Sequence, residues 1–161
     1  MKSTRNLIIP AIAALAIVAG SETVIAQELT ADQQVIDNAL YDFYYYDLDV
    51  TFLPLASGFA ASAADAPNLL EQVVIGGRNY VAAAKCDTDC DDIDIAVVDG
   101  NGITLSTDTT DADFAYAEFT PDIDQTLWIR VVPDICNSAE PCDMGVAVYE
   151  SDPALYPAPA Q

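Results

Sequence analysis

Histidine is absent from this chain of 161 residues, and lysine and arginine together number only five. Without histidine the chain lacks the usual base for activating a serine or cysteine nucleophile, and it lacks a common zinc ligand. The 26 aspartates and glutamates bring the formal net charge to −21. Such a surface repels phosphate backbones and anionic lipids, so we expect neither nucleic acid nor anionic membranes as partners.

The acidic side chains leave three interpretations open. They can form a solvated surface suited to salty surroundings, a calcium-loading surface, or an acidic face for a basic partner. Twenty of the 26 acids are aspartates, whose short side chain favours turns and helix caps. We therefore expect many of them to have structural roles in tight loops.

Apolar runs long enough to span a membrane are also missing. The apolar run Leu7–Val18 is shorter than the roughly 20 residues that a spanning helix needs. Lys2 and Arg5 precede it and Val24-Ile25-Ala26 follows it, which is typical of a secretory signal peptide over residues 1–26. We therefore expect a periplasmic or extracellular protein of 135 residues after cleavage, with one domain and no stable membrane span.

The segment after the signal peptide has a helical pattern. Thr30 stands three residues before Gln33 in a capping-box arrangement. Apolar residues then recur at helical spacing, at Val35, Ile36, Ala39, Leu40, Phe43 and Tyr46. An amphipathic helix from Ala31 to about Tyr46, within a helical region 27–50, is predicted to dock on the rest of the chain. Pro54 and the small residues of "ASAADAPN" predict a linker over residues 51–68.

From Leu69 onward, short apolar or alternating runs are separated by turn residues. Seven strands are predicted, at "LLEQVVI", "NYVAAAKC", "DIDIAVVD", "ITLST", "FAYAEFT", "TLWIRVV" and "MGVAVYE". No helix-length segment interrupts them, which favours a mainly β fold: an antiparallel, jelly-roll-like β-sandwich of about seven to eight strands over residues 69–150. The Pro- and Ala-rich tail, residues 151–161, is expected to be flexible and outside the fold.

The four cysteines form two close pairs, each between two predicted strands. Exported proteins are oxidised by default, and we favour the local disulfides Cys86–Cys90 and Cys136–Cys142 among the three connectivities that four cysteines allow. A zinc site is the alternative. Neither pair has the two-residue gap of a zinc knuckle, and the neighbouring carboxylates favour harder ions.

The stretch "KCDTDCDDIDIAVVDGNG" gathers carboxylates that make calcium the candidate metal. Five aspartates lie within eight residues, at Asp87, Asp89, Asp91, Asp92 and Asp94. An EF-hand is excluded, because a loop starting at Asp87 would put Asp92 where glycine is required. In an extended strand Asp92 and Asp94 share one face. A solvated strand face with a polar turn is the alternative to a calcium site.

Two stretches of the chain resemble those of a known group of domains: "YVAAAKCDTDCDDIDIAVVDGNGITLSTD" and "DQTLWIRVVPDICNSAEPC". They resemble the bacterial pre-peptidase C-terminal domain group, over about Leu69 to Glu150, and in particular secreted proteins with a cysteine-flanked Asp-x-Asp strand. The resemblance implies a jelly-roll-like β-sandwich appended to secreted enzymes, in a group where some members bind calcium or polymeric substrates. No protease domain accompanies the sandwich in this chain.

Aromatic residues supply the candidate binding surface. Trp128 alternates with apolar Leu127 and Ile129 and shares a strand face with Arg130. Tyr44, Tyr45 and Tyr46 cannot all face one way on a helix, so at least one should be exposed, and Tyr44 and Tyr45 are the candidates for a binding surface.

These features favour a non-catalytic binding or accessory module that engages a protein or polysaccharide partner. One alternative is a carboxylate-dependent glycoside hydrolase, which needs two carboxyls about 5 to 10 Å apart, one with a raised pKa. The other is a secreted inhibitor or partner of a basic protein.

Overall fold

The structure, a computed structural model, describes residues 28–48, 52–64, 66–137 and 140–151. The predicted signal peptide and nearly all of the Pro- and Ala-rich tail lie outside the described residues. The described part begins with α1 (Ala31–Asp42) and the π-helical turn η1 (Phe43–Asp47). The strands are β1 (Phe52–Ser62), β2 (Asn68–Val74), β3 (Tyr80–Cys86), β4 (Cys90–Val98), β5 (Thr104–Asp108), β6 (Phe114–Phe119), β7 (Gln125–Cys136) and β8 (Cys142–Ser151).

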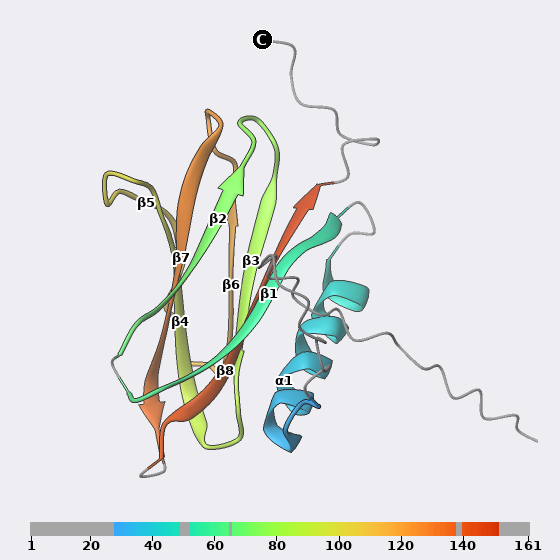
Figure 1. Ribbon diagram of the computed structural model, residues 1–161, viewed down its shortest axis with the longest axis vertical. Coiled ribbons are helices and arrows are strands. Elements are labelled where there is room, and N and C mark those ends of the chain that lie inside the picture. Colours follow the sequence, from blue (N-terminus) through green and yellow to red (C-terminus); the bar gives the residue numbers. More distant parts are fainter. Residues whose placement is uncertain (1–27, 49–51, 65, 138–139, 152–161) are drawn as a thin grey trace, which may run out of the picture.

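The strands form two four-stranded antiparallel sheets packed face to face (Figure 1). One sheet has the order β1-β8-β3-β6 and the other β2-β7-β4-β5. Consecutive strands lie in different sheets except for β4 and β5, which is the arrangement of a jelly roll. The seven strands predicted from Leu69 onward correspond to β2 through β8. The predicted mainly β sandwich with an N-terminal helix is therefore confirmed.

The predicted linker over residues 51–68 is wrong for most of its length, because β1 lies there. This strand pairs with β8 from Phe52 opposite Ser151 to Ser62 opposite Cys142. It lies at the edge of its sheet, where a proline is tolerated because one side of the strand needs no hydrogen bonds. The register shifts between Pro54 and Ala56. Small residues and a proline thus form an edge strand in a segment whose composition indicated a loop.

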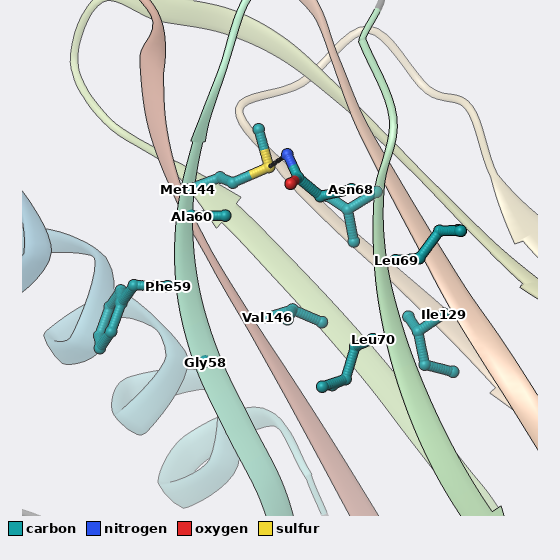
Figure 2. Close-up of a pocket in the computed structure, with 10 residues that line it drawn as sticks. Gly58, Phe59, Ala60, Asn68, Leu69, Leu70, Ile129, Met144 and Val146 are labelled. Atoms are coloured by element: carbon teal, nitrogen blue, oxygen red, sulfur yellow. Dashed lines mark hydrogen bonds between the residues drawn. The ribbon is translucent and has the colours of Figure 1, made fainter. Parts of the chain in front are cut away.

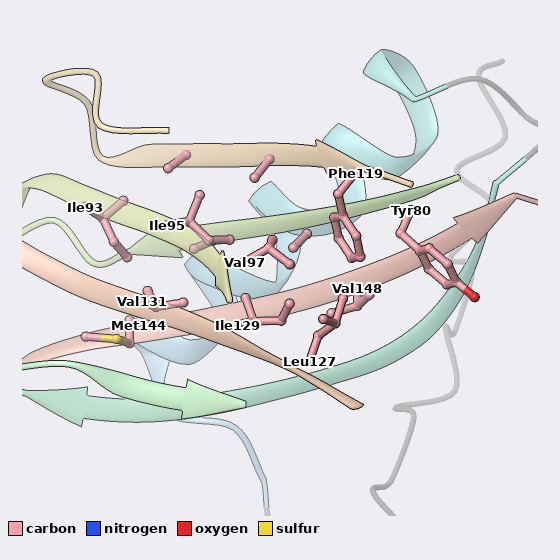
Figure 3. Close-up of a cluster of buried hydrophobic side chains, with 14 of the residues drawn as sticks. Tyr80, Ile93, Ile95, Val97, Phe119, Leu127, Ile129, Val131, Met144 and Val148 are labelled. Carbon is pink, nitrogen blue, oxygen red and sulfur yellow. The ribbon is translucent and has the colours of Figure 1, made fainter. Parts of the chain in front are cut away.

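Alternating side chains of both sheets fill the space between them (Figure 3). On β4, Ile93, Ile95 and Val97 are fully buried, and they face a layer that includes Ile129 of β7 and Val148 of β8. Every second residue of these strands is apolar, and this period of two places the apolar residues on the inner face. The core fixes which residues turn outward, and those are the residues available to bind a partner.

Helix α1 covers the outer face of the sheet β1-β8-β3-β6. The predicted capping box is present: the Thr30 hydroxyl accepts a hydrogen bond from the Gln33 amide, and the Gln33 side chain accepts one from the Thr30 amide. Ile36, Leu40 and Phe43 are buried against outward-facing residues of β3 and β8. The predicted docking of the helix within the chain is confirmed.

Two contacts hold the helix close to β8. A Cβ atom added at Gly145 would lie 2.4 Å from Cγ2 of Ile36, so a side chain at this position would push the helix away. The buried hydroxyl of Tyr149 donates a hydrogen bond of 3.0 Å to the carbonyl oxygen of Leu40. We call β1-β8-β3-β6 the covered sheet and β2-β7-β4-β5 the bare sheet, because no helix or further strand among the described residues packs on the outer face of the latter. In the described ranges, no helix has the length and apolar character that crossing a membrane would require.

Candidate functional site

The four cysteines meet at one end of the sandwich. The disulfides Cys86–Cys90 and Cys136–Cys142 are both formed, with Cα–Cα distances of 5.8 and 5.9 Å, as predicted. Cys90 of β4 lies directly opposite Cys136 of β7, so the two bonds are neighbours. The bonds close loops of only a few residues, so they mainly fix the shape of the loops at this end.

The acidic turn between β3 and β4 is held by hydrogen bonds within the chain. The carboxylate of Asp87 accepts a bond of 3.1 Å from the Asp89 amide and one of 2.6 Å from the Asp143 amide. The Asp91 carboxylate accepts a bond of 2.7 Å from the side-chain amide of Asn137. Two of the five predicted calcium ligands thus act as local acceptors that fix the turn.

Asp92 and Asp94 follow on β4, beside a bulge where the pairing with β7 shifts register. Asp92 is only 6% exposed, and its carboxylate accepts a hydrogen bond of 3.3 Å from the Ala112 amide. Partial burial raises the pKa of Asp94, and neighbouring carboxylates raise it further, namely Asp92, Asp134 and Asp108. Arg130 acts in the opposite direction.

The described residues contain no group of three or more histidine, cysteine or carboxylate side chains arranged to hold a metal ion. The donors are hard oxygens of the type that calcium prefers, but Asp87, Asp91 and Asp92 are engaged with amide groups instead. The five aspartates therefore do not fit a preformed calcium cage. Calcium binding stays a prediction from the sequence.

Trp128 and Arg130 lie on the outer face of the bare sheet. Their neighbours Leu127 and Ile129 are fully buried, whereas Trp128 is half-buried and Arg130 is exposed, as the alternation predicts. Across the strand pair, Glu71 of β2 lies opposite Trp128. The tryptophan ring therefore has a carboxylate on the neighbouring strand and a guanidinium two residues along its own strand.

Two further residues of this face were not predicted from the sequence to be part of a binding surface. Leu69 and Val73 of β2 are 63% and 67% exposed, and they flank Glu71 on the outer face. The run "LLEQVVI" places apolar residues at both alternating phases, so its pattern does not show which set is buried. Pairing with β7 decides the question, since Leu69 lies opposite Arg130.

The tyrosines of η1 lie on the other side of the molecule, above the covered sheet. Tyr44 stacks on Tyr149 at 5.4 Å between ring centroids, so it belongs to the packing of the helix. Tyr45 is 60% exposed and Tyr46 75% exposed. The structure therefore does not bring Tyr44 and Tyr45 together with Trp128 and Arg130.

An apolar cavity of about 120 Å³ opens between β1 and β2, where the two sheets part (Figure 2). Leu70, Ile129 and Val146 line it, and the side chain of Asn68 donates a 3.6 Å contact to the sulfur of Met144. No aspartate or glutamate is among the residues that line it. The cavity thus lacks the acid and base that a glycoside hydrolase needs. It was not predicted, because β1 was not predicted.

Comparison with known proteins does not extend these observations: no family model matches the chain, and no significantly similar curated protein was found. The resemblance to the pre-peptidase C-terminal group stays a prediction. The argument for function rests on the surfaces described above.

Proposed function

We propose that the protein is an exported, non-catalytic binding module that engages a neutral polysaccharide through the outer face of the bare sheet. The supporting observation is that no element of the described residues covers this face, which carries the only tryptophan of the chain. Trp128 presents part of its ring to solvent between exposed Leu69 and Val73. A patch of neighbouring exposed apolar side chains rimmed by polar ones is typical of a surface that binds a partner or ligand.

The chemistry around Trp128 suits a sugar. The C–H face of a pyranose ring stacks on an indole ring, and hydroxyl groups at the edge of the sugar need hydrogen-bond donors and acceptors nearby. Arg130 supplies donors and Glu71 supplies acceptors on the same face. The net charge of −21 disfavours acidic polysaccharides, which narrows the proposal to neutral ones.

Tryptophan fluorescence tests this proposal directly, since the signal comes from Trp128 alone. We expect a saturable change when a neutral oligosaccharide, such as a hexamer of cellulose, xylan or chitin, is added to the oxidised protein. By calorimetry, Trp128→Ala should weaken binding at least about tenfold, because it removes both an aromatic contact and apolar area.

Tyr46→Ala is the matched control, because Tyr46 is exposed on the opposite side of the molecule. This variant should bind the oligosaccharide with the same affinity as the unchanged protein. If no neutral oligosaccharide alters the fluorescence, or if both variants lose binding equally, the polysaccharide assignment is wrong. The outer face of the bare sheet would then be a candidate binding surface for a protein partner.

A further inference from the structure

A second pocket lies on the outer face of the covered sheet, between η1 and the edge strand β6. It has a volume of about 340 Å³. Six residues line it: Phe43, Asp47, Leu48, Phe114, Tyr116 and Glu118. We call it the β6 pocket. Neither the sequence motifs nor the proposed polysaccharide site includes it.

The strand pattern of β6 explains how the pocket arises. Ala115, Ala117 and Phe119 point into the core, so Phe114, Tyr116 and Glu118 alternate with them on the outer face. Helix α1 covers only part of that face. Where the helix ends at η1, the side chains of β6 emerge beside it and leave a recess.

Aromatic rings form one wall of the β6 pocket. The ring of Phe43 lies 5.0 Å from that of Phe114 and 5.4 Å from that of Tyr116, between centroids. Phe43 is buried and fixed by the helix, whereas Tyr116 is 46% exposed. The faces of aromatic rings carry a negative quadrupole and attract cations.

Two carboxylates complete the lining. Asp47 and Glu118 are both exposed, and within the described residues neither forms an ion pair. Lys85, which lies on β3 opposite Phe114, is paired with Asp113 and does not line the pocket. Among the described residues, therefore, no basic side chain balances the negative charge of the β6 pocket.

We infer that the β6 pocket binds the side chain of an arginine or lysine from a basic partner protein. The carboxylates match the charged head group, the rings of Phe43 and Tyr116 add cation–π attraction, and Leu48 contacts the aliphatic stem. The volume is at the low end for ligand sites, which suits one side chain and not a polymer. Arginine is favoured over lysine because its planar guanidinium stacks on aromatic rings.

The inference goes beyond the proposed polysaccharide site and does not depend on it. The two surfaces belong to opposite sheets, so the same protein can bind a polysaccharide on one side and a basic protein on the other. Loss of the first activity would leave the second unchanged.

Capped tripeptides provide the probe: acetyl-Gly-Arg-Gly-amide, its lysine counterpart, and a neutral control with citrulline in place of arginine. Titrated into the oxidised protein at low salt, the arginine peptide should shift the NMR signals of Phe43 and Tyr116 saturably. The citrulline peptide has the same shape without the charge, and it should not shift them. A short peptide with one charge limits unspecific attraction to the acidic surface.

Two variants test the lining, each with its fold checked by thermal melting. Glu118→Gln should lower the affinity for the arginine peptide about two- to fivefold, which is the effect of losing an exposed ion pair. Tyr116→Leu should weaken it by a similar factor of about two to five, because it keeps the apolar packing but removes the ring. Glu71→Gln on the bare sheet removes the same charge at a distance and should leave the affinity unchanged.

Three results would overturn the inference. The first is equal binding of the citrulline peptide. The second is a loss in Glu71→Gln as large as that in Glu118→Gln, which would indicate diffuse attraction by net charge. The third is tighter binding of tetramethylammonium than of either basic peptide, which would assign the pocket to a free small cation.

Discussion

Each sheet of the sandwich turns one face to the core and one face outward, and the two outward faces differ in composition and cover. On the covered sheet the outward residues of the central strands that lie beneath α1 are apolar: Val81, Ala83 and Tyr149 are buried there. On the bare sheet the outward residues mix exposed Leu69 with Glu71 and Arg130. The part of the first face beneath α1 therefore contributes stability, whereas the second face is available for recognition over its whole length.

The same comparison separates two groups of aromatic residues. Phe43 and Tyr44 face other rings of the covered side and hold the helix in place. Trp128 has no such partner ring among the described residues; its ring would lie 3.6 Å from a Cβ atom added at Gly100, in the turn after β4. Aromatic content alone does not mark a binding surface, but the lack of cover does.

The largest difference between the two faces should appear in stability. Ile36→Ala removes a fully buried side chain between α1 and Gly145, and we expect it to lower the free energy of unfolding by about 2–5 kcal/mol. Leu69→Ala, on the bare sheet, should change it by less than about 0.5 kcal/mol. Urea unfolding with the disulfides intact measures both. Similar losses in the two variants would contradict the division into covered and bare faces.

Much of this architecture was predictable from the chain. Apolar residues at every second position of "DIDIAVVD" and "TLWIRVV" identified β4 and β7, and the Thr30–Gln33 pattern located the start of α1. These signals are local, so the sequence is enough to interpret them. The two disulfides were also predictable, because each pair brackets a single turn.

The remaining features depend on contacts between distant parts of the chain. β1 exists because its small residues and Pro54 pair with the far end of the chain in β8, which composition does not indicate. The β6 pocket joins η1 to a strand about 70 residues later, so no local pattern could predict it. The five clustered aspartates do not form a preformed metal cage for a similar reason, since the amides of Ala112 and Asp143, which bond to Asp92 and Asp87, come from other loops and strands.

A smaller effect on stability, one that depends on pH, should distinguish Asp94 in β4 from Asp99 in the turn that follows it. Burial and neighbouring carboxylates raise the pKa of Asp94, while hydrogen bonds from Ile103 and Asn101 lower the pKa of Asp99. A carboxyl whose pKa is raised on folding destabilises the folded protein when it ionises. The free energy of unfolding therefore falls as the pH rises from the ordinary pKa to the folded-state pKa, and the full loss of stability is present at neutral pH. For Asp99 the sign is opposite: its contribution is present at neutral pH and is lost as the pH falls through the lowered value.

At neutral pH, Asp94→Asn should therefore raise the melting temperature by about 1–3 °C, a surface effect reduced by solvent screening. Asp99→Asn should lower it. Both differences in melting temperature should shrink when the pH is brought below the ordinary pKa range of aspartate, because the carboxyls are then protonated. Melting curves over a pH series measure this, and a destabilised Asp94→Asn protein at neutral pH would show that the carboxylate has a favourable partner.

The smallest expected effect concerns calcium at the acidic end of the bare sheet. Because Asp87, Asp91 and Asp92 already accept hydrogen bonds from amides, an ion would have to displace those bonds before it could be coordinated. We therefore expect calcium to produce no saturable heat in calorimetry and no rise in melting temperature when added to chelator-treated protein at physiological salt. Saturable binding that disappears in Asp92→Asn and Asp94→Asn would instead establish the calcium site predicted from the sequence, and would show that the turn rearranges around the ion.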